Sequence, residues 1–155
     1  MRTDVEQRVD LPRAVVEPSE QGALALAQAY WDEIARLTLG LVRARPAGSG
    51  VEIAVGRRLP LLRFGPPATT ASESVVECRF PIEGGLLAKR SGGSLALRQV
   101  TAPVPQLAVV VEGYSPRLDS GGPRGLRTFT YRAVQERIHS LIGRRYLERM
   151  TGRRP

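Results

Sequence analysis

The stretch from residue 38 to residue 114 limits the fold more than any other part of the sequence. It consists of short segments with strand-like patterns, separated by turns that contain glycine or proline. A parallel pair of strands needs a crossover of about a dozen residues, and these connections are shorter. Successive strands are therefore expected to pair antiparallel. The segments are 38–45, 51–55, 59–64, 74–82, 86–90, 94–100 and 106–114.

Two of these segments carry the clearest patterns. In 74–82 the side chains of Cys78 and Phe80 alternate with those of Glu77 and Arg79, which is typical of a strand with one buried face. Segment 106–114 is the most apolar, so it is expected to be central or covered on both faces. The Ser-Gly-Gly turn at 91–93 predicts a hairpin between 86–90 and 94–100.

A helix is predicted on each side of this stretch. The first begins after Ser19, whose side chain can cap the free amide groups, and Glu20 lies in the positive first turn. The pattern continues to about Leu37. The apolar face is expected to comprise Ala23, Ala27, Tyr30, Trp31, Ile34 and Ala35, with Asp32, Glu33 and Arg36 on the opposite face.

The last helix is predicted over 127–150. Its apolar stripe follows i, i+3, i+4 spacing through Tyr131, Val134, Ile138, Leu141 and Ile142. Continuing the same steps of roughly 100° places Arg145 and Arg149 in the direction of that stripe. We therefore expect the helix to project past the sheet or to bend at Gly143, leaving a charged end available for a partner.

The chain is expected to form one domain over residues 1–155. Residues 1–12 are charged and predicted to be a frayed terminus, and 13–17 to be a short strand. Residues 115–126 are rich in Pro, Gly, Asp and Ser, which is typical of a mobile loop, and residues 151–155 form a basic tail.

The predicted fold class is α+β: a curved antiparallel sheet of about six strands packed on a long C-terminal helix, with one N-terminal helix. This order, with helix residues such as Tyr131, Val134 and Ile138, resembles the START/Bet v 1-like superfamily, also called SRPBCC or helix-grip. The resemblance implies a sheet wrapped around the C-terminal helix with a ligand cavity between them. A small closed barrel capped by the terminal helices is the alternative.

If the resemblance holds, inward residues of the strands and the last helix line a mostly apolar ligand pocket. The ligand-binding candidates are Cys78, Phe80, Leu97, Val109, Val134 and Ile138. A solid core would produce the same apolar alternation, so both interpretations remain open.

The sequence contains no motif for catalysis, a cofactor or a metal, and we predict no catalytic residue, no cofactor and no metal site. The glycine pairs lack the spacing of a phosphate-binding loop. Cys78 is the only cysteine and His139 the only histidine. Glu77 and Glu112 are expected on the outer face, paired with Arg79 or Arg98. If that face were covered, one of these carboxylates could instead act as a base.

The net charge of +8 comes almost entirely from arginine, since Lys89 is the only lysine. A GC-rich coding sequence explains this bias without a functional demand. Residues 127–155 nevertheless hold 8 Arg against 2 Glu, so positive charge concentrates at the C-terminus. No segment resembles a secretory signal or a membrane span, so a cytoplasmic location is expected.

Three functions fit these patterns. The first is binding of a small apolar or amphipathic ligand between the sheet and the C-terminal helix. The second is a cyclase- or hydrolase-like enzyme of the same architecture. The third is a solid-cored interaction protein whose Arg-rich C-terminus binds an acidic partner or nucleic acid. The sequence alone leaves oligomeric state open.

Overall fold

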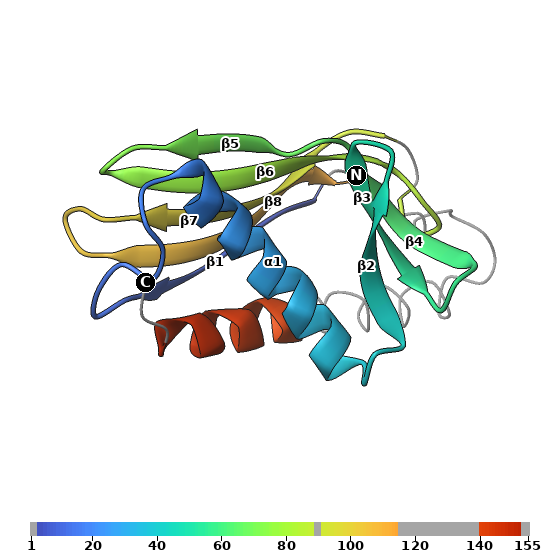
Figure 1. The fold of residues 1–155 in the computed structure, drawn as a ribbon, viewed down its shortest axis with the longest axis horizontal. Coiled ribbons are helices and arrows are strands. Elements are labelled where there is room, and N and C mark those ends of the chain that lie inside the picture. Colours follow the sequence, from blue (N-terminus) through green and yellow to red (C-terminus); the bar gives the residue numbers. More distant parts are fainter. Residues whose placement is uncertain (1–2, 89–90, 115–139, 153–155) are drawn as a thin grey trace.

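The computed structural model describes residues 3–88, 91–114 and 140–152. Figure 1 shows a curved sheet with the described helices on one face. The strands are β1 (Thr3–Asp10), β2 (Val42–Ala47), β3 (Gly50–Val55), β4 (Leu59–Phe64), β5 (Ala68–Ala71), β6 (Val75–Gly84), β7 (Ser94–Val100) and β8 (Gln106–Tyr114). The helices are α1 (Glu20–Leu37) and the C-terminal helix, described over 140–151. The predicted α+β class is confirmed.

The sheet has eight strands in the order β1-β8-β7-β6-β4-β3-β2, and β5 pairs with β6 beside that path. Every pair is antiparallel, as predicted. The prediction of about six strands was too low, because β1 and β5 were not expected. Segment 86–90 does not form a strand over its described residues; residues 86–87 form a turn and residue 88 makes only an isolated bridge. β8 lies between β1 and β7, which fits its apolar sequence.

The N-terminal segment forms strand β1, so the prediction of a frayed terminus is wrong for residues 3–10. β1 pairs with β8 from Val5↔Val111 to Asp10↔Gln106. Among the described strands it is an edge strand that pairs only with β8, and its inward side chains, Gln7 and Val9, alternate with exposed charged ones. Pairing along one side is enough to order this polar segment against an apolar neighbour.

The segment between β1 and α1 is not a strand, in contrast to the prediction for 13–17. It is held by the side-chain amide of Gln99 in β7, which is 1% exposed. Its Oε1 accepts hydrogen bonds from the backbone N–H groups of Val15 (2.7 Å) and Val16 (3.1 Å), and its Nε2 donates to the Val16 carbonyl (3.1 Å). A buried amide thus replaces the strand partner that this segment lacks.

Helix α1 begins as the sequence predicts, with the Ser19 hydroxyl oxygen accepting from the Gly22 N–H at 3.0 Å. The predicted apolar face is buried apart from the half-buried Ala35, but Glu33, expected on the opposite face, is 1% exposed. The C-terminal helix covers this side of α1. Arg149 of that helix donates through Nε to Glu33 Oε2 at 2.6 Å, and Arg36 donates through Nη1 at 2.8 Å. The buried carboxylate is therefore paired with two cations.

The C-terminal helix does not turn away from the core at Gly143. Its buried stripe continues to its end through Ile142, Gly143, Tyr146, Leu147 and Met150, whereas Leu141 is 36% exposed. The Tyr146 hydroxyl donates to the Leu26 carbonyl of α1 at 3.0 Å. The predicted stripe residues at 131, 134 and 138 lie outside the described residues.

The expectation of a bend at Gly143 was wrong because the buried face of the helix was placed on the wrong side. Ile142 lies at one border of the buried face, and the face extends from there away from Leu141. Arg145 and Arg149 therefore stand at this border and not within the buried stripe. Gly143 allows close approach, because a Cβ at this position would overlap the side-chain oxygen of Gln7 in β1. The helix therefore packs against β1 and α1 along this half (Figure 1).

Candidate functional site

An open cleft of about 580 Å³ lies between α1 and the β2–β3 hairpin. One wall is α1, the other is β2 with the start of β3, and β6 contributes to the floor. Volumes of about 300–1,000 Å³ are typical of small-molecule sites. The lining residues are Leu24, Ala27, Gln28, Trp31, Asp32, Ala35, Arg43, Ala44, Arg45, Pro46, Gly50, Val51, Pro67 and Phe80.

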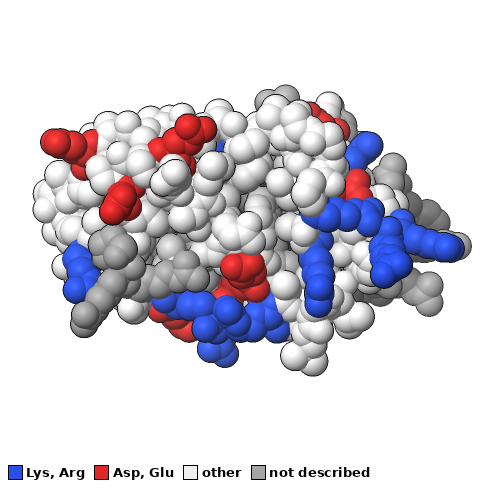
Figure 2. Space-filling model, in the orientation of Figure 1, with Lys and Arg blue, Asp and Glu red and all other residues white. Residues whose placement is uncertain are grey.

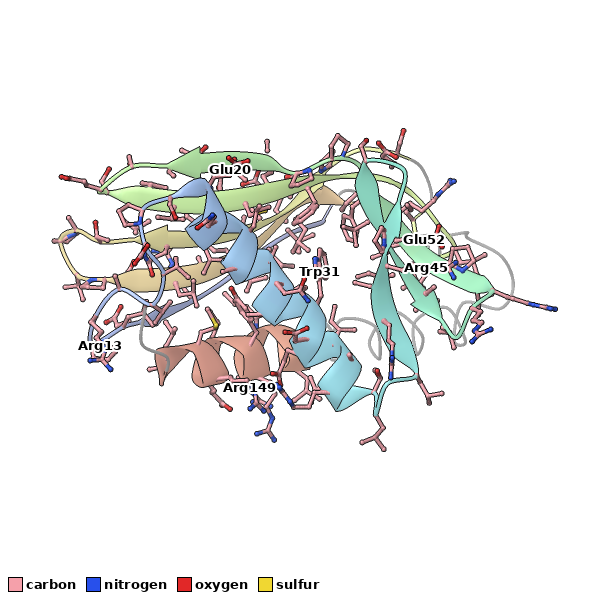
Figure 3. All side chains as sticks on the ribbon, in the orientation of Figure 1. Arg13, Glu20, Trp31, Arg45, Glu52 and Arg149 are labelled. Atoms are coloured by element: carbon pink, nitrogen blue, oxygen red, sulfur yellow. The ribbon has the colours of Figure 1, made fainter. Side chains whose placement is uncertain are left out.

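Two aromatic rings that line the cleft, Trp31 and Phe80, belong to a cluster with Phe64, which does not itself line it. Trp31 projects from α1 toward β2 and β3 (Figure 3). The centroid of its ring lies 5.2 Å from that of Phe80 and 5.6 Å from that of Phe64, and the two phenylalanines are 6.0 Å apart. Edge-on and tilted arrangements at these distances are favourable, and they hold the rings in fixed positions. The cluster supplies a rigid apolar surface.

The β2 wall is a free edge of the sheet. In an antiparallel ladder, alternate residues exchange hydrogen bonds with the neighbouring strand. The hairpin turn makes Arg43 and Arg45 residues that exchange hydrogen bonds with β3. The bond from the Gly56 N–H to the Leu41 carbonyl (3.0 Å) continues the same alternation. The N–H and C=O of Ala44 therefore point away from β3, toward the cleft. No described residue bonds to them.

The neighbouring edge positions differ from Ala44. The Val42 N–H donates to the Thr38 hydroxyl oxygen at 3.0 Å, so that edge group is satisfied. Pro46, two residues after Ala44, has no N–H to donate. Ala44 is consequently the one position along this edge, within the described chain, that offers both a free donor and a free acceptor to the cleft.

Charged and polar side chains form the rim. Gln28 Nε2 donates to Asp32 Oδ1 at 2.9 Å on the α1 side. On the β2 side, Arg43 Nε donates to the Gly40 carbonyl at 3.0 Å, and Arg45 Nε donates to Glu52 Oε1 at 3.0 Å. Figure 3 shows Arg45 and Glu52 next to each other on β2 and β3. The cleft thus has an apolar floor and a polar rim that carries charges of both signs.

The predicted ligand-binding residues lie in different places. Cys78, Leu97 and Val109 point inward from β6, β7 and β8 and are at most 4% exposed, packed in the main hydrophobic core. Phe80 contributes to the cleft and is the one predicted residue among its lining side chains. Val134 and Ile138 lie outside the described residues. Sequence reasoning did not identify the α1 wall or the β2 edge as parts of one site.

Cys78 is packed in the core as a small apolar residue. Burial raises the pKa of its thiol to about 11, with a further contribution from the neighbouring Glu77 carboxylate. A thiol with this pKa is almost entirely protonated at neutral pH, so it is a poor nucleophile.

The outer-face carboxylates form cross-strand ion pairs, as predicted. Glu77 Oε1 accepts from Arg98 at 2.7 Å and from Arg79 at 3.2 Å, and Arg79 also reaches Glu112 Oε2 at 3.3 Å. Burial by itself would raise the pKa of Glu77, but the hydrogen bonds from Arg98 and Arg79 outweigh it and lower that pKa. A carboxylate held in its ionised form by two arginines is not suited to act as a base near neutral pH.

Two classes of site are absent from the described residues. They contain no group of three or more His, Cys, Asp and Glu side chains placed to hold a metal ion. No helix within the same ranges is long and apolar enough to cross a membrane. His139 lies outside these ranges.

Comparison with known proteins finds no match, whether with family models, curated protein sequences or solved structures.

Proposed function

We propose that the cleft between α1 and β2–β3 binds a small amphipathic ligand. The observation that carries the proposal is a volume of about 580 Å³ whose floor holds Trp31 and Phe80. Its wall holds backbone groups of Ala44 to which no residue in the described ranges bonds. The aromatic floor favours an apolar or aromatic body. The Ala44 N–H and C=O favour a group that can both accept and donate a hydrogen bond, since unpaired polar groups are costly to bury.

The resemblance to the helix-grip superfamily supports the same class of function, because that arrangement places a ligand between the sheet and a helix. The proposed site differs in one respect from the expected cavity. Helix α1 forms its helical wall, and the predicted pocket residues Cys78, Leu97 and Val109 belong to the packed core. The part of that prediction that rests on Val134 and Ile138 stays a prediction.

No observation favours an enzyme. The buried carboxylate, Glu33, does not line the cleft and is paired with Arg36 and Arg149. The rim carboxylate, Asp32, is exposed and bonded to Gln28. Binding of an acidic partner by the Arg-rich C-terminus stays a prediction. Two of its arginines have intramolecular partners: Arg149 contacts Glu33, and Arg145 contacts Glu148 at 3.7 Å.

The test uses Trp31, which is the only tryptophan in the chain and lies in the proposed site. The fluorescent probe 1-anilinonaphthalene-8-sulfonate has an aromatic body and an anionic group. We expect it to bind and to quench Trp31 by energy transfer. Native mass spectrometry of protein purified from its own host is expected to show a co-purifying small molecule.

Two variants on the same helix provide a matched comparison. Ala35 lines the cleft, whereas Ala25 is exposed on another side of α1. Ala35→Phe should fill the cleft and weaken probe binding by at least about tenfold, which corresponds to about 1.4 kcal/mol. Ala25→Phe should leave binding unchanged. Equal binding by both variants, or no quenching of Trp31 in the parent protein, would refute the site.

A further inference from the structure

Three exposed leucines lie in or beside the α1–β2 and β3–β4 turns, at the end of the molecule opposite the β7–β8 turn (Figure 1). Leu39 is 93% exposed, Leu41 is 66% exposed and Leu59 is 46% exposed. Leu39 and Leu41 lie in the turn between α1 and β2, and Leu59 begins β4. We call these three residues the leucine tip. Single exposed leucines are ordinary, but several together on one protruding end indicate a contact surface.

Leu39 is exposed and also has an unfavourable backbone conformation. The Leu39 N–H donates to the Arg36 carbonyl (3.2 Å) and the Gly40 N–H to the Ala35 carbonyl (2.7 Å), the two bonds of a Schellman helix end. Leu39 occupies the left-handed position of this motif, with φ of 54°, where glycine is usual. The chain therefore holds a leucine where the backbone disfavours it and where it packs against nothing. Such a conformation often marks a functional position.

Two turns are joined to form the tip. The Gly56 N–H donates to the Leu41 carbonyl at 3.0 Å, which brings the β3–β4 turn beside the α1–β2 turn. Arg45 of β2 donates through Nη1 to the Arg57 carbonyl at 2.6 Å, which fixes the β3–β4 turn to β2. The leucines are thus presented on a fixed support and not on a free loop.

Arginines surround the leucine tip. Arg43, Arg57 and Arg58 are exposed, and none of them contacts a carboxylate in the described chain. The single acidic residue between positions 38 and 59, Glu52, is paired with Arg45. Figure 2 shows basic side chains gathered at the end of the molecule formed by β2, β3 and β4. The tip therefore combines apolar side chains with uncompensated positive charge.

We propose that the leucine tip docks the protein on an anionic lipid surface. Leu39 and Leu41 would enter the boundary between headgroups and acyl chains, while Arg43, Arg57 and Arg58 contact lipid phosphates. Apolar insertion together with cationic attraction is the combination that binds proteins to membrane surfaces without a spanning segment. A nucleic acid offers the same phosphate charge, but it provides no apolar layer for exposed leucines, so the lipid surface is the better fit.

Co-sedimentation with vesicles tests this proposal. The protein should bind vesicles that contain phosphatidylglycerol, should not bind vesicles of phosphatidylcholine alone, and should dissociate as NaCl is raised. Replacing Arg57 and Arg58 with serine should weaken binding about 25-fold, at about fivefold for each arginine near the surface. The control replaces Arg13 and Arg144, two exposed arginines away from the tip, with serine and should bind like the parent.

The leucine variants separate the possible partners. Leu39→Ser with Leu41→Ser should weaken vesicle binding at least about tenfold, whereas Val104→Ser, which alters a 46% exposed residue in the β7–β8 turn, should not. Circular dichroism and thermal melting verify that each variant folds. Absence of binding to phosphatidylglycerol vesicles at low salt would overturn the proposal. So would binding to RNA or DNA that exceeds vesicle binding and is unaffected by the leucine changes.

Discussion

Leu39 holds a backbone conformation that costs a leucine free energy and costs a glycine almost none. We expect Leu39→Gly to raise the free energy of unfolding by about 0.5–1 kcal/mol, the relief of left-handed strain less the added entropy of glycine in the unfolded chain. Urea unfolding measures this change, and the dependence of the unfolding free energy on urea concentration should be the same as in the parent. The matched variant Leu41→Gly has no strain to relieve and should be destabilised. If Leu39→Gly is no more stable than the parent, Leu39 does not hold a strained left-handed conformation in the folded chain.

One buried polar side chain, Gln99, shows what a residue-by-residue view of the sequence misses. Gln99 follows Leu95 and Leu97 at inward positions of β7, so the alternation itself places an amide in the core. That signal was available, because an inward amide requires hydrogen-bond partners. Its partners, Val15 and Val16, could not be identified, since they lie more than 80 positions away and have no motif.

At the scale of elements, the start of β3 depends on close packing against β4. A Cβ at Gly50 would overlap the Phe64 backbone carbonyl and lie 2.9 Å from the Gly65 carbonyl carbon. We expect Gly50→Ala to lower the free energy of unfolding by about 1–3 kcal/mol, because backbone atoms cannot move aside cheaply. Chemical denaturation measures the change.

Gly143 provides the comparison for this prediction. A Cβ there would meet the end of the Gln7 side chain, which can rotate away at the cost of its 3.1 Å bond to the Ser140 carbonyl. Gly143→Ala should therefore be the milder change, and its free energy of unfolding should stay within about 1 kcal/mol of the parent value. If Gly143→Ala lowered the free energy of unfolding more than Gly50→Ala does, this account of the two contacts would be wrong.

The elements with strong local patterns were predictable. Helix α1, the hairpin strands and the antiparallel pairing follow from a capping serine, apolar alternation and short connections. β1 was not predictable, because an edge strand rich in charge resembles a disordered terminus. The buried face of the C-terminal helix was also misjudged. Arg149 stands at its border, where a long side chain reaches Glu33 while Tyr146 and Met150 fill the core.

For the whole molecule, the outer face of the sheet gives a prediction about pH. Glu77 of β6 is paired with Arg98 of β7 and with Arg79, which also contacts Glu112 of β8. The pKa of Glu77 is lowered in the folded chain, so its contribution to stability is present above its ordinary pKa of 4.5 and is lost as pH falls through the folded value.

The measurement compares Glu77→Gln with the parent at pH 7 and at pH 3. At pH 7 the variant should be less stable by on the order of 1 kcal/mol, as partly exposed ion pairs allow. The difference should shrink at pH 3, because the parent carboxyl then approaches the neutral state of the glutamine. Glu73→Gln, at an exposed glutamate without an ion pair among the described residues, should show no such pH dependence.

The cleft belongs to the scale of the whole molecule, and for that reason the sequence did not reveal it. Its walls come from α1 and from an edge strand, and its floor includes Phe80 of β6. Each part carries an ordinary pattern: an apolar helix face, an alternating hairpin and a buried strand. Only the assembled sheet order places β2 at the end of the sheet with its backbone facing α1.

An unpaired sheet edge beside an open cleft is a hazard during synthesis and storage, because a strand of another chain can add to it and begin aggregation. In β2 few edge backbone groups are available for such addition. Thr38 occupies the edge amide of Val42, Pro46 offers no donor, and Ala44 alone lies between them. A single donor and acceptor pair can hold one small molecule, but it gives an incoming strand too few bonds for stable growth. The chain can thus keep its edge accessible without polymerising through it.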